Sequence, residues 1–171
     1  MAVIINGTTG ITGAPLQSGT TVTTTSGTSI DFTSIPSWVK RITVMFSLVS
    51  TSGTSIKQIQ LGTSGGIQTT GYSGCSVGFG TSTFTNTNYT TGFAIRSASA
   101  SESIGGTIVL TLLDSANGIW TAQGVSADSS VNGAWITAGA KTLSGALDRI
   151  RITTVNGTDT FDAGNINIIY E

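Results

Sequence analysis

The sequence predicts an all-β domain, an antiparallel two-sheet sandwich, and three observations support this. The 171-residue chain contains 31 Thr and 22 Ser but is only 9% charged, and the Cβ branching of Thr, Val and Ile favours the extended strand. Short runs of these residues alternate with turn signals at a spacing of about 8 to 12 residues, as in sandwich domains. No segment keeps the i, i+3, i+4, i+7 apolar period of a long helix.

Residues 1–27 differ from the rest of the chain, because they contain no charged side chain and are dense in Gly, Thr and Ser. Two interpretations are open: a frayed terminus, or an arm that lies on another subunit or on a partner. The apolar residues favour the arm, since a solvated tail does not need them, and they are Ala2, Val3, Ile4, Ile5 and Ile11. We therefore predict an extended N-terminal docking arm over 1–27 and a β-sandwich domain over 28–171.

The first long strand of the sandwich is predicted after Pro36, which marks an entry turn because proline cannot donate to the ladder. Both of its faces are largely apolar: one carries Ile42, Val44, Phe46 and Leu48, and the other carries Val39, Met45 and Val49. A strand that is apolar on both faces is typical of the centre of a sheet. A second strand is predicted over 55–62, followed by short strands and long loops over the Gly-rich segment 64–95.

The clearest hairpin covers residues 104–126, with Asn117-Gly118 at the reversal. A further pair of strands is predicted over 131–155. The sequence then predicts turns at Asn156-Gly157 and at Ala163-Gly164. The last strand places Ile166, Ile168 and Tyr170 on one face.

The composition excludes several classes of function. The net charge is −1 and the seven basic residues are scattered, so the chain lacks the cationic footprint of a nucleic-acid-binding protein. No apolar run approaches the roughly 20 residues of a membrane-spanning helix, so no membrane insertion is expected. Cys75 is the only cysteine, which rules out an intrachain disulfide and suits folding in a reducing cytoplasm.

The sequence also lacks the residues of the common catalytic sites. There is no histidine, so His-dependent nucleophilic triads and the usual zinc sites are absent. Eight carboxylates remain, but their positions in the sequence do not indicate the facing pair that a glycosidase needs. Asp159 and Asp162 lie in a turn-like segment without the regular acidic spacing of calcium loops. We predict no enzyme activity, catalytic residue, metal site or cofactor, and we leave ion binding at these two aspartates open.

One neighbourhood could present aromatic rings to a ligand. Five aromatic residues occur between positions 72 and 93, in a segment rich in Thr, Asn and Ser: they are Tyr72, Phe79, Phe84, Tyr89 and Phe93. Rings above hydroxyl and amide groups can bind a sugar, so these residues are a candidate ligand or receptor surface. The alternative is that the rings pack under the loops or between subunits, where aromatic side chains contribute large buried areas.

Three stretches resemble a module of tailed-bacteriophage virion proteins, namely the C-terminal domain of tail-fibre-like proteins. The stretches are "GTSIDFTSIPSWVKRITVMFSLVSTSGTS", "IQLGTSGGIQTTGY" and "LDRIRITTVNGTDTFDAGNINIIYE", and the leader "INGTTGITGAP" is similar to the short collars before such domains. The resemblance implies a jelly-roll type of sandwich, usually a homotrimer, exposed on the particle. It carries no catalytic residue to this chain.

The resemblance and the arm together lead to the expected function. Taken alone, the resemblance favours a fibre tip, but residues 1–27 contain no repeats of a fibre shaft. We therefore expect a trimeric capsid decoration (cement) protein at the virion surface, assembled in the cytoplasm of the host bacterium. It would dock its arm on the major capsid protein or another virion protein and stabilise the shell. The alternative is a short tail fibre or fibre tip that recognises a host surface glycan.

Overall fold

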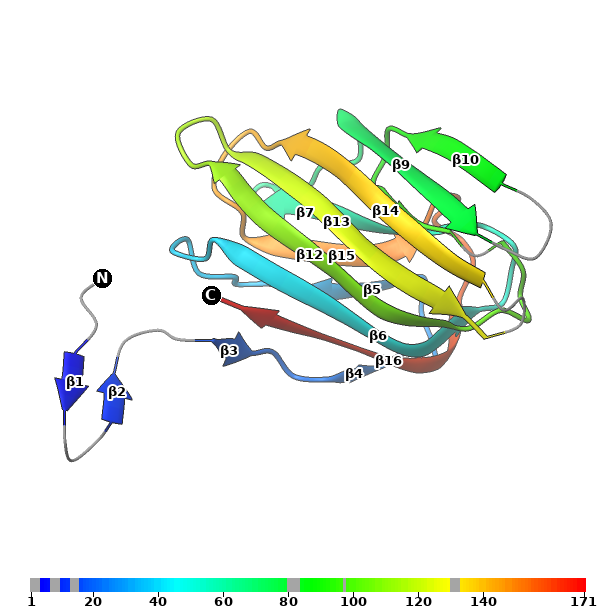
Figure 1. Ribbon diagram of the computed structural model, residues 1–171, viewed down its shortest axis with the longest axis horizontal. Helices are drawn as coiled ribbons and strands as arrows, with labels where there is room; N and C mark the ends of the chain where they lie inside the picture. Colours follow the sequence, from blue (N-terminus) through cyan, green and yellow to red (C-terminus); the bar gives the residue numbers. More distant parts are fainter. Residues whose placement is uncertain (1–3, 7–9, 13–15, 80–83, 97, 130–132) are drawn as a thin grey trace.

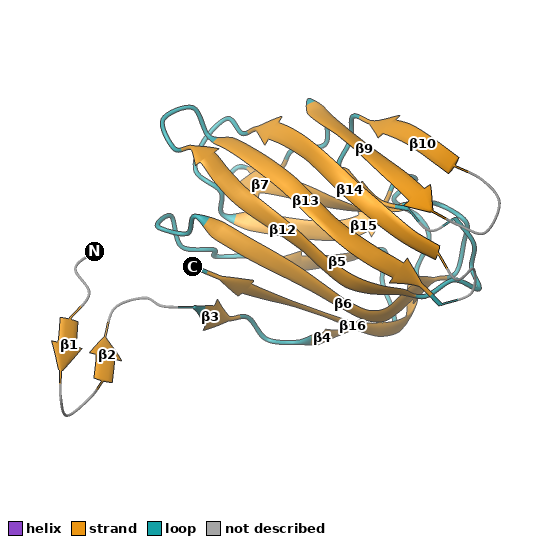
Figure 2. Ribbon diagram, viewed as in Figure 1, coloured by secondary structure: helices purple, strands orange, loops and turns teal. Residues whose placement is uncertain are grey.

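The computed structural model describes residues 4–6, 10–12, 16–79, 84–96, 98–129 and 133–171, with the backbone alone described for residues 4–6, 10–12, 79 and 84–87. The described residues contain strands and loops and no helix (Figure 2). Two antiparallel sheets pack face to face as a β-sandwich of the jelly-roll type, which confirms the predicted fold class.

The larger sheet has nine strands and lies at the front of Figure 1. Along the sheet it contains β10 (Phe84–Tyr89), β9 (Tyr72–Phe79), β14 (Gly133–Thr142), β13 (Ile119–Asp128), β12 (Ile104–Asp114), β6 (Arg41–Thr51), β16 (Phe161–Tyr170) and β3 (Gln17–Ser18), and β4 (Val22–Thr23) also pairs with β16. The predicted hairpin of residues 104–126 is β12–β13, and its reversal contains Gly118 with a φ of 64°. The predicted central strand is β6, which lies between β12 and β16.

The smaller sheet has five strands and lies behind the larger one. Its order is β11 (Phe93–Ile95), β7 (Lys57–Thr63), β15 (Arg149–Thr154) and β5 (Ser29–Phe32), and β8 (Gly66–Ile67) also pairs with β7. Both sheets direct alternate side chains into the space between them, as the period of two in a strand requires. The resulting core includes Ile42, Val44 and Phe46 of β6, Ile108 and Leu110 of β12, Ile59 and Leu61 of β7, and Ile150 and Ile152 of β15.

The sequence pattern was wrong at one place, where β6 and β16 meet. The alternation predicts that Leu48 shares the buried face of Phe46, but Leu48 is 61% exposed with a φ of 53°. The next residue, Val49, is fully buried instead. The register between β6 and β16 shifts here, so that Leu48 and Val49 lie opposite Gly164 in a β-bulge. Gly164 has a φ of 95°, and a Cβ there would lie 2.4 Å from the Leu48 carbonyl oxygen. The predicted turn at Ala163-Gly164 is therefore a bulge inside one continuous strand.

The predicted arm consists of two parts with different surroundings. Residues 16–27 run along the sandwich, because β3 and β4 pair with the outer side of β16 and the Thr24 hydroxyl donates to the Ala163 carbonyl oxygen at 2.6 Å. Before them, β1 (Ile4–Asn6) and β2 (Gly10–Thr12) form a small antiparallel hairpin. This hairpin pairs with neither sheet and stands apart from both of them in Figure 1.

Candidate functional site

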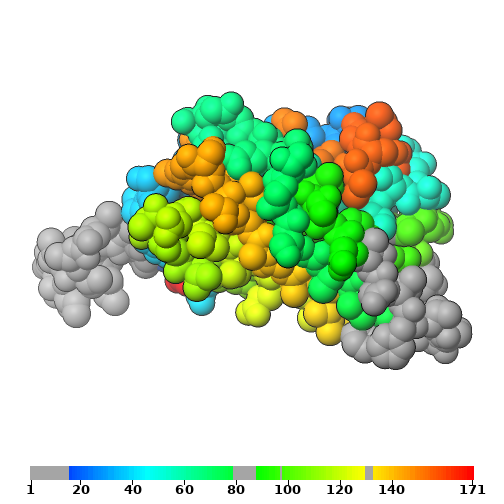
Figure 3. Space-filling model, turned by 90° about the horizontal axis from the view of Figure 1, so that it is seen from above, coloured from blue at the N-terminus to red at the C-terminus, as the bar shows by residue number. Residues whose placement is uncertain are grey.

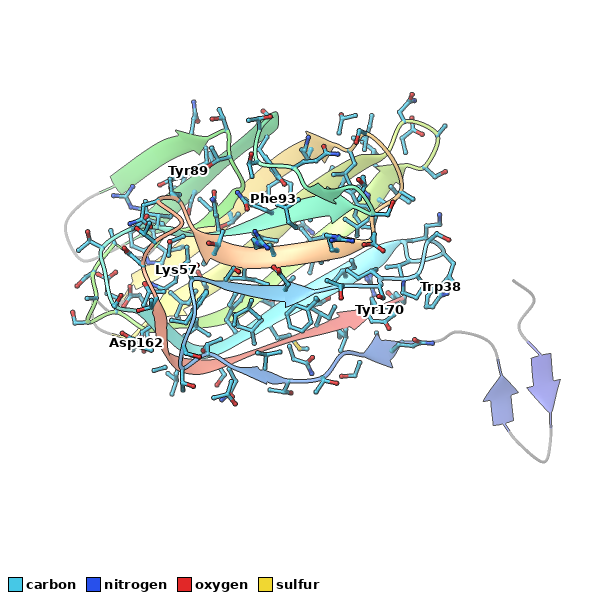
Figure 4. The ribbon with its side chains drawn as sticks, turned by 180° about the vertical axis from the view of Figure 1, so that it is seen from behind. Trp38, Lys57, Tyr89, Phe93, Asp162 and Tyr170 are labelled. Carbon is cyan, nitrogen blue, oxygen red and sulfur yellow. The ribbon has the colours of Figure 1, made fainter. Side chains whose placement is uncertain are left out.

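Of the five aromatic residues predicted as a ligand surface, the three whose side chains are described do not form an exposed cluster. Phe93 is fully buried and Tyr72 is 3% exposed, and their rings meet edge to face with centroids 5.1 Å apart. Tyr89 is also buried (Figure 4). Phe79 and Phe84 lie opposite each other on β9 and β10, and their side chains fall outside the described residues. The three described rings therefore pack in the interior, which is the alternative that the sequence had left open.

Tyr72 links the two sheets through its hydroxyl group. The Leu61 N–H on β7 donates to the Tyr72 hydroxyl oxygen at 2.7 Å, and that hydroxyl donates to the Gln68 carbonyl oxygen at 2.9 Å. Burial raises the pKa of Tyr72 to about 12, because the charged phenolate is poorly solvated there. The Lys141 ammonium lies 5.4 Å from the centroid of the ring. These contacts make Tyr72 a structural residue of the core.

The arm residues are placed only in part. Ala2 and Val3 fall outside the described residues. Ile4 and Ile5 lie in β1, and Ile11 lies in β2 directly opposite Ile5. A hairpin with three residues in each strand has too few hydrogen bonds and too little buried surface to be stable in water by itself.

A charged cluster around the buried Lys57, which the sequence analysis missed, lies at one end of the sandwich. Lys57 is 1% exposed, because its side chain lies on the same inward face of β7 as those of Ile59 and Leu61. Burial lowers the pKa of Lys57, and the nearby carboxylates of Glu102, Asp128, Asp162 and Asp159 partly offset this by attracting the ammonium group. Figure 4 shows Lys57 and Asp162 at the same end of the molecule. The cluster joins the smaller sheet to the larger one.

Asp159 and Asp162 are engaged in hydrogen bonds that hold loops together. Asp159 accepts from the Ser55 N–H at 2.9 Å and from the Asn156 side-chain amide at 2.7 Å, and Asp162 accepts from the Ser50 hydroxyl. These bonds tie the β6–β7 loop to the β15–β16 turn. Within the described part of the chain, no group of three or more His, Cys, Asp or Glu residues is arranged to hold a metal ion.

A cavity of about 480 Å³ opens at the opposite end of the sandwich. Three loops surround it, and its walls include Val39, Trp120 and Leu143 below and Lys40, Asn117 and Ser144 at the rim. No carboxylate, thiol or second basic side chain lines it. The cavity therefore holds no pair of groups for general acid–base catalysis.

The outward face of the larger sheet is the broadest feature without an assigned role. Directly paired residues of neighbouring strands share a face, so the strand register defines its cross-strand rows. Two adjacent rows form its centre: one contains Met45, Thr107, Val125, Ile136 and Val77, and the other contains Thr43, Val109, Gln123, Ala138 and Cys75. We call these residues the uncharged face. Val125 and Ile136 lie side by side and are 53% and 43% exposed.

The comparisons with known proteins identify no relative. No protein-family model matches the chain, and no curated protein or solved structure was found to match it. Among the described residues, no helix is long and apolar enough to cross a membrane. The functional interpretation therefore depends on the sequence and on the geometry of the described residues.

Proposed function

We propose that this protein is a non-enzymatic structural protein of a tailed-phage virion. It is a homotrimer that decorates the capsid surface, docks on the major capsid protein through its N-terminal arm, and stabilises the shell. The observation that supports this proposal most directly is the β1–β2 hairpin, which pairs with neither sheet. A hairpin of this size needs a partner surface to stay folded, and capsid subunits supply one in every copy of the lattice.

The chemistry of the described residues fits an adhesive role. The cavity lacks an acid–base pair, and the buried Tyr72 hydroxyl is held by internal hydrogen bonds. The glycan-binding alternative depended on exposed rings, but Tyr72, Tyr89 and Phe93 are buried. Capsid decoration is therefore the function that we prefer.

Deletion of residues 2–11 tests the docking role of the arm. Purified protein is mixed with phage shells that lack it, and the bound fraction is measured by co-sedimentation. The deletion should reduce binding to background, because the apolar residues of β1 and β2 are removed, while the number of chains in the free assembly stays unchanged. Binding that survives the deletion would contradict the proposal.

Two single substitutions within β1 give a matched pair for this test. Ile5→Asp and Asn6→Asp add the same charge at neighbouring positions of the strand, but only the first also removes an apolar side chain. Ile5→Asp should reduce shell binding strongly, and Asn6→Asp should reduce it less. Equal effects of the two variants would show that charge, and not apolar contact, governs docking.

A further inference from the structure

The fifteen charged residues of the chain are distributed unevenly between the two outer faces of the sandwich. Asp31 and Arg151 lie on the outer face of the smaller sheet, and Lys57, Asp128 and Lys141 point into the interior. Most of the others lie in loops or at strand ends. The outward positions described for the larger sheet contain charged residues only at the margin: Arg41 at the first residue of β6, Asp114 at the last of β12 and Asp162 at the second of β16.

The centre of that sheet is thus free of charge over five strands. The rows that flank the uncharged face add no charged residue before Arg41, and they contain Gly105, Ala127, Ala134 and Phe79 on one side and Thr111, Thr121, Ala140 and Ser73 on the other. An antiparallel sheet with one face in water normally alternates apolar inward residues with polar and charged outward ones. Here the outward residues include the adjacent exposed pair Val125 and Ile136.

We propose that the uncharged face is the contact surface on which copies of this chain pack against each other. The inference rests on the proposed function only for the expected number of copies, which is three. The partner is another copy of this chain, because around a threefold axis the uncharged face of each copy can pack against those of its two neighbours with no ion to desolvate and no like-charge repulsion. Thr107, Thr121 and Gln123 supply side-chain donors and acceptors that can pair across such a contact.

The size of the face agrees with this partner. Together with the rows that flank it, the face spans five strands about 4.8 Å apart and about eight residues of each at about 3.3 Å, which is an area of about 600 Å². Stable interfaces bury about 800 Å² on each partner, so the central strands supply most of the area, and the neighbouring strands β16 and β10 can supply the remainder. The cross-strand pair of Val125 and Ile136 lies near the middle of this area, where interface contacts contribute most.

Two other occupants fit the face less well. A membrane surface is recognised by Lys and Arg together with Trp and Tyr, and the uncharged face contains none of these residues. A glycan is bound by exposed aromatic rings, and the ten residues of the uncharged face include no aromatic residue. A second copy is the partner that the composition of the face fits.

The first test measures molecular mass by light scattering during size-exclusion chromatography. The wild-type protein should elute at three times the 17.4 kDa mass of one chain. The double variant Val125→Asp, Ile136→Asp should raise the dissociation constant by at least about 100-fold and elute as a single chain, because two carboxylates would be buried without partners. A wild-type protein that is monomeric at high concentration would overturn the inference.

A matched control separates this face from general surface effects. Val155 is 43% exposed, as Ile136 is, but it lies in the turn after β15, away from the larger sheet. Val155→Asp should therefore leave the mass unchanged, whereas Ile136→Asp should weaken association. Far-ultraviolet circular dichroism and thermal unfolding show whether each variant is folded. An equal loss of association in both variants, or none in Ile136→Asp, would contradict the inference.

The single cysteine provides a second readout that does not depend on a destabilising substitution. Cys75 is partly exposed and belongs to the uncharged face, in the row that contains Ala138. In the wild-type assembly its thiol should react slowly with a maleimide reagent, and dilution to the monomer should accelerate the reaction. A labelling rate that does not depend on protein concentration would show that another surface mediates association. Such a result would leave shell binding by the arm, and with it the proposed function, to be decided separately.

Discussion

Asp31, Arg149 and Arg151 lie on or beside the outer face of the five-stranded sheet, and Arg151 donates two hydrogen bonds, of 2.8 and 2.7 Å, to the Asp31 carboxylate. The outer face of the nine-stranded sheet carries Thr, Val, Ala, Met and Gln at the equivalent central positions. The backbone pairing is antiparallel in both sheets, so the contrast comes from the side chains alone. A face with ion pairs is stable in water, whereas a face without them gains more from covering its apolar groups.

The contrast continues inside the sandwich, where the smaller sheet again carries charge. Lys57 of β7 is buried, yet four carboxylates lie close enough to act on it electrostatically. This chain, which has few charged residues, places them in ion pairs, in loops or beside buried Lys57. They lie away from the centre of the outer face of the larger sheet.

The largest effect is expected from removing the buried charge of the smaller sheet. Lys57→Ala should lower the free energy of unfolding by about 3 kcal/mol, because the neighbouring carboxylates lose the attraction of its ammonium group and a cavity remains. Urea unfolding followed by circular dichroism measures this. The exposed Lys40→Ala variant is the control and should change the free energy by no more than about 0.5 kcal/mol. Similar values for both variants would show that the cluster is not important for stability.

The next effect concerns pH and the hydroxyl group that links the two sheets. The pKa of Tyr72 is raised to about 12, so its contribution to stability is complete below pH 10 and is lost as the pH rises toward 12. The free energy of unfolding should therefore fall by about 2–3 kcal/mol over that interval. Tyr72→Phe should be less stable at pH 7, since the Leu61 N–H loses its acceptor, but its stability should fall less steeply above pH 10. Parallel slopes for the two proteins would contradict this role.

A smaller effect is expected on the charged outer face. A double-mutant cycle with Asp31→Asn and Arg151→Met should give a coupling energy of about 0.5 kcal/mol, because both side chains are more than one third exposed and water screens the pair. The association of copies should not change in either variant, since the pair lies on the other side of the sandwich. Dissociation of either variant into monomers would mean that the smaller sheet, and not the uncharged face, forms the contact.

The smallest effect is expected from salt. A contact without ion pairs does not weaken when charges are screened, so the molecular mass should stay constant between about 0.05 M and about 1 M sodium chloride. The Asp31–Arg151 coupling should decrease over the same range. Salt-induced dissociation would show that charged residues participate in the contact and would weaken the contrast between the two faces.

Much of the fold could be predicted because it depends on local alternation. The β12–β13 hairpin and the central strand β6 follow from periods of two and from the Asn117-Gly118 turn. The bulge at Leu48 could not be predicted, because it is caused by a register shift against β16, a strand distant in the sequence. One inserted position exposes Leu48 and buries Val49.

The candidate site was harder to predict for the same reason. The burial of Tyr72 and Phe93 depends on how β9 and β11 pack against each other, and the sequence shows only that aromatic residues are near one another. The inward position of Lys57 could have been predicted, because Lys57 lies two and four residues before Ile59 and Leu61 and so shares their face of the strand. The uncharged face required the register of five strands, which fixes Val125 beside Ile136 and Thr107.

The pairing of β6 with β16 has a consequence for how the protein is made. Ile42 pairs with Tyr170 and Phe46 with Ile166. The pairing of β6, near the start of the sandwich, therefore cannot be completed before β16, near its end, has been synthesised. During translation β6 emerges from the ribosome early and exposes an unpaired apolar edge until residues 161–170 arrive. Such edges recruit other strands and lead to aggregation. Slowed elongation or premature termination before β16 should therefore yield insoluble chains, even though most of the sandwich sequence is already present.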